Sequence, residues 1–362
     1  MKNDPFAPNL LERLPAPPQK VVLLCASRIG DFLCAVPALR ALRARLPDAE
    51  ISMITLPLLH DLARRLPALD KVLPFPGFPG IAEHLFEARP TVHFLQQAQR
   101  EHFDLAIQMQ GTGVYSNPFV LLLGARATAG FVRPGDQPGL LTAALPHPHH
   151  LHEIHCVLAL TDFLGAPSMG EELEFPLTEL ERLRATTFLE DLPRPWIGIH
   201  PSSRDPERCW PLKHYVSLAE QLLARQGGTL LLFGDAEAQP AGQFIEQRLP
   251  EHCVDLAGKV SLLTLGALIE QLSLLITNDS GPAHIAYALH TSTITLFSKS
   301  TSLPTNGPLQ PGPFRLLYPQ ELALSASSPR SLDQTGGIQH ISVPQVLHAA
   351  EELLQEARHR AF

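Results

Sequence analysis

The sequence predicts an α/β protein built from two domains with open parallel sheets, whose natural ligand site is the cleft between them. Three observations support this class. Short apolar runs alternate with stretches of helical spacing, which is typical of open parallel sheets. The pattern of strand, polar turn and helix starts twice, at Lys20 and again at Trp196. The length of 362 residues accommodates about two domains of ordinary size.

The first half of the chain predicts a domain at 20–175, preceded by an irregular, Pro-rich tail at 1–19. Its first apolar run, 20–26 (KVVLLCA), has the composition of a buried parallel strand. The next stretch, 32–46, has helical spacing, but Pro37 lies inside it and predicts a kink or a later start. The other expected elements are strands at 50–56, 71–75 and 104–110, helices at 57–66, 91–101, 116–123 and 153–164, and Pro-rich loops at 74–80 and 133–152.

The second half predicts another α/β domain, at 196–342. A linker at 176–195 precedes it; the linker contains one expected helix, 178–189, and ends in a Pro-Arg-Pro hinge. The other expected elements are strands at 196–200, 229–233, 253–255, 272–276 and 293–297, and helices at 212–226, 237–248, 262–270, 283–289 and 343–360.

The composition excludes several classes of protein. A net charge of −8 argues against general nucleic-acid binding, which needs an excess of Lys and Arg. No apolar run has the length of a membrane span, and the N-terminus lacks the apolar centre of a signal peptide. The five cysteines form no CxxC pair, which fits reduced thiols. We therefore predict a cytoplasmic protein.

The segment 276–289 (ITNDSGPAHIAYAL) has the pattern of a phosphate-binding turn. An apolar strand at 272–276 leads into the polar turn 277–281 (TNDSG), and Pro282 suits the first position of a helix. Such a junction directs backbone N–H groups and the positive end of the helix dipole at one point. His284 lies on the following helix, and the whole set is richer in polar residues than a simple turn needs.

Three more polar turns follow predicted strands, and each has a structural alternative. Asp31, after Gly30, is either a helix cap or a general base that takes a hydroxyl proton. The loop 200–210 (HPSSRDPERCW) is either a solvated loop or an anion site made by its hydroxyls and arginines. The turn 233–237 supplies a carboxylate that either caps the next helix or accepts hydrogen bonds from ribose hydroxyls.

Other common sites have less support. Five histidines within 147–155 resemble a metal site by number, but their spacing matches no zinc motif, so we interpret them as a solvated loop. The motifs GxxxxGK[ST], GxGxxG and GxSxG are absent, which argues against a P-loop enzyme, a dehydrogenase and an α/β-hydrolase. We predict neither a bound metal nor a cofactor.

Taken together and in this order, the four turns resemble those of the heptosyltransferases of glycosyltransferase family 9. The resemblance spans roughly residues 20–350, and RIGD and NDSGPAH in their relative places are its most specific parts. It rests on RIGDFLCAVPALRALR (28–43), HEIHCVLALTDFLG (152–165), HPSSRDPERCWPLKHYVSLAEQL (200–222) and LAGKVSLLTLGALIEQLSLLITNDSGPAHIAYAL (256–289), with the TITLFS that follows.

This resemblance implies the GT-B fold, in which two Rossmann-like domains face a cleft. The N-terminal domain would receive the acceptor, the C-terminal domain would hold the nucleotide sugar, and the last helix, 343–362, would pack back toward the N-terminal domain. Family members move heptose from ADP-heptose to the lipopolysaccharide core, with inversion and without a metal. The implied partners are therefore a nucleotide sugar and a lipopolysaccharide-type glycan.

The resemblance also assigns roles to residues. It implies that Asp31 is the catalytic base, with Arg28 and Gly30 on the acceptor side. The base would take the proton of the attacking hydroxyl, while the helix N-terminus and Arg208 stabilise the leaving diphosphate. The implied donor and phosphate-binding residues are Ser202, Ser203, Arg208, Glu237, Asp279, Ser280, Gly281, Pro282 and His284.

Some positions depart from the family pattern. Arg208 stands where the family usually has Lys, Ser298-Lys299 stands in place of Gly-Pro, and the loops 74–80 and 133–152 have no counterpart. They leave two alternatives: a GT-B protein that binds a sugar nucleotide or glycan without transferring it, or a transferase with another donor and acceptor. A lipopolysaccharide acceptor implies peripheral contact with the inner face of the cell membrane. The residues that either face anionic lipid or form a solvated helix face are Arg40, Arg43, Arg45, Arg64 and Arg65.

Overall fold

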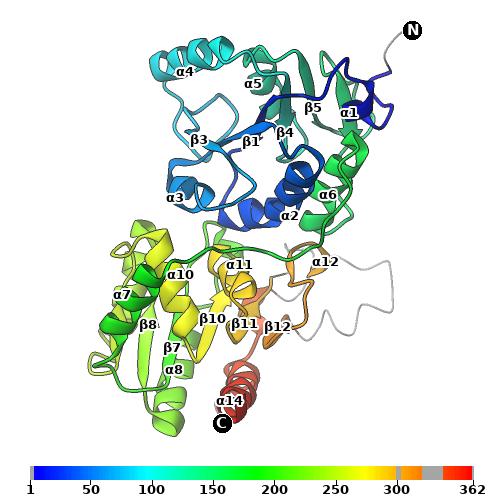
Figure 1. Ribbon diagram of the computed structural model, residues 1–362. Helices are drawn as coiled ribbons and strands as arrows, with labels where there is room; N and C mark the ends of the chain where they lie inside the picture. The colour runs from blue at the N-terminus through cyan, green and yellow to red at the C-terminus, as the bar shows by residue number, and fades with distance from the viewer. Residues whose placement is uncertain (1–3, 299–302, 320–336, 361–362) are drawn as a thin grey trace, which may run out of the picture. The chain divides into compact units, whose positions relative to one another are not determined.

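The computed structural model divides the chain into two compact units, Met1–Pro176 and Leu177–Phe362. The structure describes residues 4–298, 303–319 and 337–360. Within these residues each unit contains one six-stranded sheet with parallel pairing throughout, and helices accompany both sheets (Figure 1). The predicted α/β class with two parallel sheets is confirmed.

The sheet of the first unit has the order β3-β2-β1-β4-β5-β6. The chain runs outward from β1 (Lys20–Cys25) to β3 and then returns to β4 (Leu105–Gln108) on the other side of β1. The strand order therefore reverses between β1 and β4, and both central strands are buried apolar runs. The other strands are β2 (Glu50–Thr55), β3 (Lys71–Pro74), β5 (Ala127–Val132) and β6 (Ala143–Pro146).

Two long helices pack side by side in this unit, α2 (Ile29–Arg45) and α6 (Glu153–Leu164) (Figure 1). The expected late start of α2 is wrong, because the helix begins at Ile29 and includes Pro37 in its interior. The proline is buried among apolar neighbours on α2, and packing there outweighs the loss of one backbone hydrogen bond. The other helices are α1 (Leu10–Arg13), η1 (Pro57–Leu59), α3 (His60–Ala63), α4 (Ala88–Arg100) and α5 (Ser116–Leu122).

Three elements of the first unit were not expected. The N-terminal segment, expected to be irregular, contains α1, whose Leu10 and Leu11 are buried. The backbone N–H of Asn9 donates to the carbonyl oxygen of Phe163 at 2.7 Å, which ties this segment to α6. Strand β5 (ATAGFV) has two alanines and a glycine among its first four residues, and β6 (AALP) lies inside the Pro- and His-rich stretch. Neither therefore has the continuous run of large apolar residues that marks a buried strand.

The sheet of the second unit has the order β12-β11-β10-β7-β8-β9. Its first strand, β7 (Trp196–His200), lies at the centre beside β10 (Leu274–Asn278), and the order reverses between them. The edge strand β12 was not expected; its four residues are half-buried. The other strands are β8 (Thr229–Leu232), β9 (Cys253–Asp255), β11 (Thr293–Leu296) and β12 (Phe314–Leu317).

The helices of the second unit include α7 (Glu179–Leu189), which falls in the segment expected to be a linker. This helix packs along α10 (Leu262–Gln271) (Figure 1). Arg182 of α7 forms an ion pair with Glu270 of α10 at 2.8 Å. The others are η2 (Pro206–Arg208), α8 (Leu212–Gln226), η3 (Ala236–Ala238), α9 (Gln239–Glu246), α11 (Gly281–Ala288), α12 (Leu303–Asn306), η4 (Ile338–His340) and α14 (Val343–Arg360).

The C-terminal helix α14 contributes its apolar face to the core of the second unit. Val346, Ala350 and Leu353 are fully buried there, in one cluster with residues of α8, β10 and β11. Packing of this helix toward the first unit stays a prediction, but the buried face of α14 is already occupied within its own unit.

Two of the five arginines proposed to face a membrane, Arg40 and Arg43, form ion pairs within the first unit. Arg40 pairs with Glu172 at 3.2 Å and also with Glu174. Arg43 pairs with Asp70 and donates to the carbonyl oxygen of Ala49 at 2.8 Å. Among the described residues, no helix is both long and apolar enough to cross a membrane.

Candidate functional site

The candidate site of the second unit lies where its strand order reverses. Thr277 of β10 is in register with His200 of β7, so the two strands end side by side. The loop 201–211 leaves β7 and the turn 279–280 leaves β10 at this same edge of the sheet. Ligands of open parallel sheets bind at the carboxyl ends of the strands at such a reversal. The structure thus brings two of the predicted turns together.

The turn after β10 opens directly into α11. Ser280 is the N-cap residue, and the helix begins at Gly281, two residues earlier than predicted. Pro282 is therefore the second helical residue, where its lack of an N–H still costs nothing. His284 is buried on the same helix and contacts the ring of Tyr287 edge-on. The first turn of α11 directs backbone N–H groups at this edge, as an anion site requires.

Arg208 and Asp279 meet at this edge, although 70 residues separate them. Nη1 of Arg208 lies 3.6 Å from Oδ2 of Asp279, and its Nε lies 3.6 Å from Oδ2 of Asp205. Asp279 is 4% exposed, whereas about one third of the Arg208 side chain is exposed. Both contacts are ion pairs whose N–O distances are longer than that of a hydrogen bond. The guanidinium is thus held near the helix start, and among the described residues its buried Nε has no hydrogen-bond partner.

His200 joins the two segments and was missed by sequence reasoning. Its Nδ1 lies 3.2 Å from Oγ of Ser280 and 3.3 Å from Oγ1 of Thr277, and its Nε2 lies 3.4 Å from Oγ of Ser202. Burial lowers the pKa of the imidazole to about 4, so the ring is neutral at pH 7. The available signal was a histidine at a strand end, two residues before a Ser-Ser pair.

Asn278, the last residue of β10, holds the same edge together through its side-chain hydrogen bonds. Its Oδ1 accepts from the backbone N–H of Trp210 at 3.2 Å and from the hydroxyl of Tyr215 at 3.0 Å. The indole N–H of Trp210 in turn donates to the carbonyl oxygen of Ile341 at 2.8 Å. Asn278, Trp210 and Tyr215 are all buried, so they fix where the loop after β7 ends and α8 begins.

The remaining predicted residues of this unit lie on neighbouring turns. Ser203 is half-buried in the loop after β7, and its carbonyl oxygen accepts from Sγ of Cys209. Glu237 is exposed on η3, after β8, while Asp235 caps that turn by accepting from the N–H of Ala238 at 3.1 Å. The capping interpretation thus holds for Asp235, and a ligand role for Glu237 stays a prediction. Ser298 is buried after β11, and Lys299 lies outside the described residues.

The predicted residues of the first unit lie at the start of α2. Arg28 is the N-cap residue, Gly30 is half-buried, and Asp31 is an exposed first-turn acid, so Asp31 is not itself the N-cap. This turn follows β1 at the reversal between β1 and β4. The side-chain carbonyl of Gln110, from the turn after β4, accepts from the N–H of Ala26 and links the two turns.

A second carboxylate, Glu153, lies near Asp31 and was also missed. It is the first residue of α6, the helix that packs on α2, and His152 caps this helix by accepting from the N–H of Ile154 at 3.2 Å. Burial, and secondarily the negative charge of Asp31, raise the pKa of Glu153 from 4.5 to about 7. Two carboxylates therefore share this edge, one exposed and one half-buried.

Replacing Glu153 with Gln is expected to stabilise the protein at high pH only. Between pH 4.5 and 7 the folded chain binds more protons at Glu153 than the unfolded chain, so the free energy of unfolding falls as pH rises through that window. Gln cannot ionise, so the unfolding free energy of the variant does not fall at this site over that pH range. The variant should gain about 2–3 kcal/mol at pH 8 and little at pH 4.5, measured by chemical denaturation. Glu220→Gln, at an exposed site on α8, is the control; an identical pH dependence in both variants would contradict the assignment.

The histidine-rich stretch has structural roles. His147 packs on the ring of Phe131 at 4.8 Å between centroids, and its burial lowers its pKa. His155 pairs with Glu171 at 2.9 Å. Within the ranges that the structure describes, no group of three or more His, Cys, Asp or Glu side chains is arranged to hold a metal ion. All five cysteines are free thiols.

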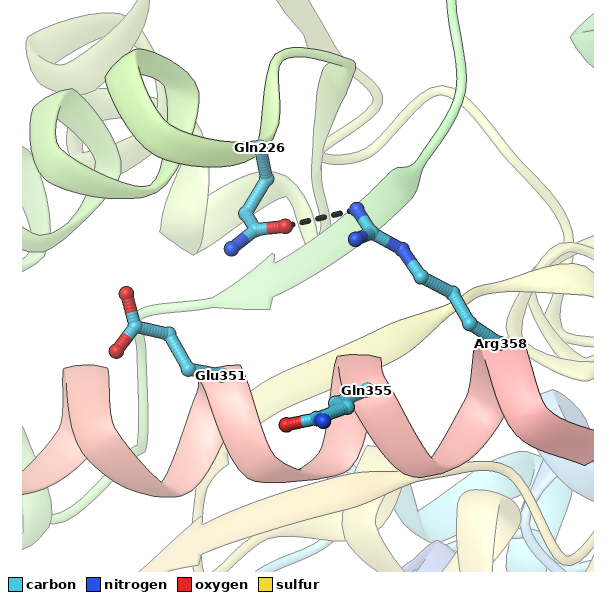
Figure 2. Close-up of a pocket in the computed structure, with 4 residues that line it drawn as sticks. All are labelled: Gln226, Glu351, Gln355 and Arg358. Atoms are coloured by element: carbon cyan, nitrogen blue, oxygen red, sulfur yellow. Dashed lines mark hydrogen bonds between the residues drawn. The ribbon is translucent and has the colours of Figure 1, made fainter.

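A pocket of about 500 Å³ lies elsewhere in the second unit, between α8 and α14 (Figure 2). Gln226, Glu351, Gln355 and Arg358 line it, and Nη2 of Arg358 donates to Oε1 of Gln226 at 2.8 Å. Gln226 ends α8 just before β8 begins, so the pocket lies at the amino edge of the sheet, opposite the edge where ligands bind. We do not assign a ligand to it.

Sequence comparisons match this chain to one family model and to several named relatives. The model of the family described as "Glycosyltransferase family 9 (heptosyltransferase)" matches residues 92–314. Lipooligosaccharide heptosyltransferase 2 of Haemophilus influenzae is 27% identical over 297 residues, which cover 78% of this chain and 84% of the relative. Lipopolysaccharide heptosyltransferase 2 of Escherichia coli is 28% identical over 298 residues, which cover 78% and 83%.

Solved structures show the same fold. The structure of E. coli ADP-heptose lipopolysaccharide heptosyltransferase II superposes with a TM-score of 0.75 at 22% identity, covering 94% of this chain and 99% of that one. A glycosyl transferase family 9 structure from Veillonella parvula also has a TM-score of 0.75, at 21% identity, covering 93% and 97%. At these identities the likeness extends to the fold alone.

Proposed function

The chain belongs to glycosyltransferase family 9 and has the GT-B fold, and from this premise we propose that it moves heptose from ADP-heptose to a lipopolysaccharide-core or related glycan acceptor. One observation carries the donor half of the proposal. Arg208 meets Asp279 beside Ser280 and the start of α11, at the reversal of strand order in the second unit. A cation, a hydroxyl and helix N–H groups in one place are suited to a diphosphate.

The donor diphosphate would bind at this edge of the second unit. The first turn of α11 and the guanidinium of Arg208 would contact the phosphates, together with the hydroxyls of Ser202 and Ser280. Glu237, exposed on the turn after β8, would accept hydrogen bonds from ribose hydroxyls. Asp279 would orient Arg208 through their ion pair rather than touch the anion, because two negative groups repel.

The acceptor would bind at the corresponding edge of the first unit, near Arg28 and Gly30. Its hydroxyl oxygen would attack the anomeric carbon from the face opposite ADP while the bond from that carbon to the phosphate oxygen breaks. Asp31 would take the hydroxyl proton, and ADP would leave with the bonding electrons. The reaction inverts the anomeric centre. An exposed carboxylate in the first turn of α2 is accessible to a hydroxyl, as a general base must be.

Charge stabilisation by the protein would replace a metal in this mechanism. Negative charge develops on the leaving diphosphate, and Arg208 with the N–H groups of α11 would stabilise it there. Metal independence predicts that transfer continues in excess chelator. We further propose that the enzyme works in the cytoplasm, with peripheral contact to the inner face of the membrane that carries its acceptor.

Nucleotide specificity tests the proposal most directly. A thermal-shift screen of the full chain with ADP, UDP and GDP should raise the melting temperature with ADP alone. Incubation with ADP-heptose and a heptose-deficient lipopolysaccharide core should then release ADP and yield a glycosylated acceptor. A shift with UDP or GDP would assign another donor. Binding of ADP-heptose without transfer to any glycan would favour the alternative of a binding protein, which the replacement of the usual Lys by Arg208 keeps open.

A further inference from the structure

His200 contacts both segments proposed to bind the donor diphosphate, although it is itself buried. The ring is 8% exposed, whereas Ser202 and Ser280 are half-buried and remain accessible from the carboxyl edge of the sheet. Each of the two ring nitrogens faces one of these serines, at 3.4 Å and 3.2 Å. The imidazole therefore lies between the loop after β7 and the turn after β10.

The neutral imidazole carries a single ring N–H, and this links the orientations of the Ser202 and Ser280 hydroxyls. A neutral imidazole has one N–H and one lone pair, so it donates on one side and accepts on the other. If Nε2 donates to Ser202, the hydrogen of that hydroxyl is available for an anion, and Nδ1 must accept from Ser280 or Thr277. The opposite tautomer reverses these roles. Both hydroxyls on the Nδ1 side can also donate to the carbonyl oxygen of Asn278, at 2.9 Å for Thr277 and 3.1 Å for Ser280.

We propose that His200 is a positioning residue that couples the hydroxyls of Ser202 and Ser280, so that the two segments engage a nucleotide diphosphate as one unit. The inference rests on the proposed function, because the ligand is the diphosphate of the donor. Neutrality of the ring at pH 7 follows from its burial, which lowers its pKa to about 4. A hydrogen-bond chain with only one mobile ring proton makes each serine's orientation depend on the other's.

A double-mutant cycle tests the coupling. ADP affinity is measured by titration calorimetry for the full chain, Ser202→Ala, Ser280→Ala and the double variant. Each single change should weaken binding about tenfold, as loss of a hydrogen bond to a charged group does. The double change should weaken binding by about tenfold to twentyfold rather than a hundredfold, because removing either serine already disrupts the chain. Ser203→Ala with Ser280→Ala is the matched control, and its effects should multiply.

The same cycle in two His200 variants separates coupling from folding. His200→Asn keeps a polar group near the Nδ1 position, and His200→Gln keeps one near the Nε2 position, so each retains contact with one serine only. In both backgrounds the effects of Ser202→Ala and Ser280→Ala should multiply, while the melting temperatures identify any variant that fails to fold. The inference would be overturned if the effects of the two serine substitutions on ADP affinity multiplied in the wild-type background. It would also be overturned if they were equally non-additive in the His200 variants. Either result would leave the proposed donor site standing. No ADP binding by the wild type would overturn the proposed donor site as well.

Discussion

Asp31→Asn is expected to lower kcat for glycosyl transfer by about 10²–10⁴-fold while ADP binding stays within about twofold of wild type. Asn has nearly the same shape and keeps the first-turn position on α2, but it cannot accept the hydroxyl proton. The residues proposed to bind the diphosphate lie in the second unit, after β7 and β10, so the substitution changes none of them. Steady-state release of ADP from ADP-heptose, with calorimetry for ADP, measures both quantities.

Asp61→Asn provides the matched control for this variant. Asp61 is also an exposed first-turn acid, on α3 of the same unit, so the control makes the same change of charge at another helix start. Its kcat should match that of the wild type. Full activity of Asp31→Asn would remove Asp31 from the mechanism and leave the first-turn acid with only its favourable interaction with the helix dipole.

The central strands could be predicted because their amino-acid composition distinguishes buried strands from other elements. β1, β7 and β10 are apolar runs of five or six residues that lead into polar turns, and buried parallel strands require this composition. β5 and β6 could not be identified in this way. Their Ala-rich sequences bury less side chain per residue, so they join the sheet through pairing with β4 and its neighbours rather than through their own propensity.

Residues of the candidate site could likewise be predicted only where the local sequence carries a signal. Arg208 and Asp279 were recognised because each lies in a polar turn after a strand, and the adjacency of β7 and β10 then brings them together. His200 has only a weak local signal, its place at a strand end close to a serine pair, and Glu153 has none. The role of His200 depends on hydroxyls from the segments that follow β7 and β10, and the raised pKa of Glu153 depends on its burial and on Asp31. Tertiary packing creates both features, so a single sequence does not reveal them.

Arg208→Gln is expected to lower kcat by about 10²–10³-fold, the loss usual when one stabilising group for developing charge is removed. Gln keeps the length of the stem but removes the positive charge beside the start of α11. Arg208→Lys keeps a charge without the forked geometry, so it should retain activity within about tenfold of wild type. Rates measured for all three proteins with ADP-heptose, at saturating acceptor, distinguish charge from geometry.

Stability complicates Arg208→Gln, because the substitution also removes the ion pair of the buried Asp279. Loss of this partner is expected to cost about 2 kcal/mol of unfolding free energy. Asp279→Asn in the same chain removes the carboxylate that was left behind and should recover most of that stability. Activity should not recover with it, because the leaving diphosphate still lacks its cation. Recovery of both in the double variant would mean that Arg208 acts only by neutralising Asp279, and the stabilisation of the leaving group would then fall to the N–H groups of α11.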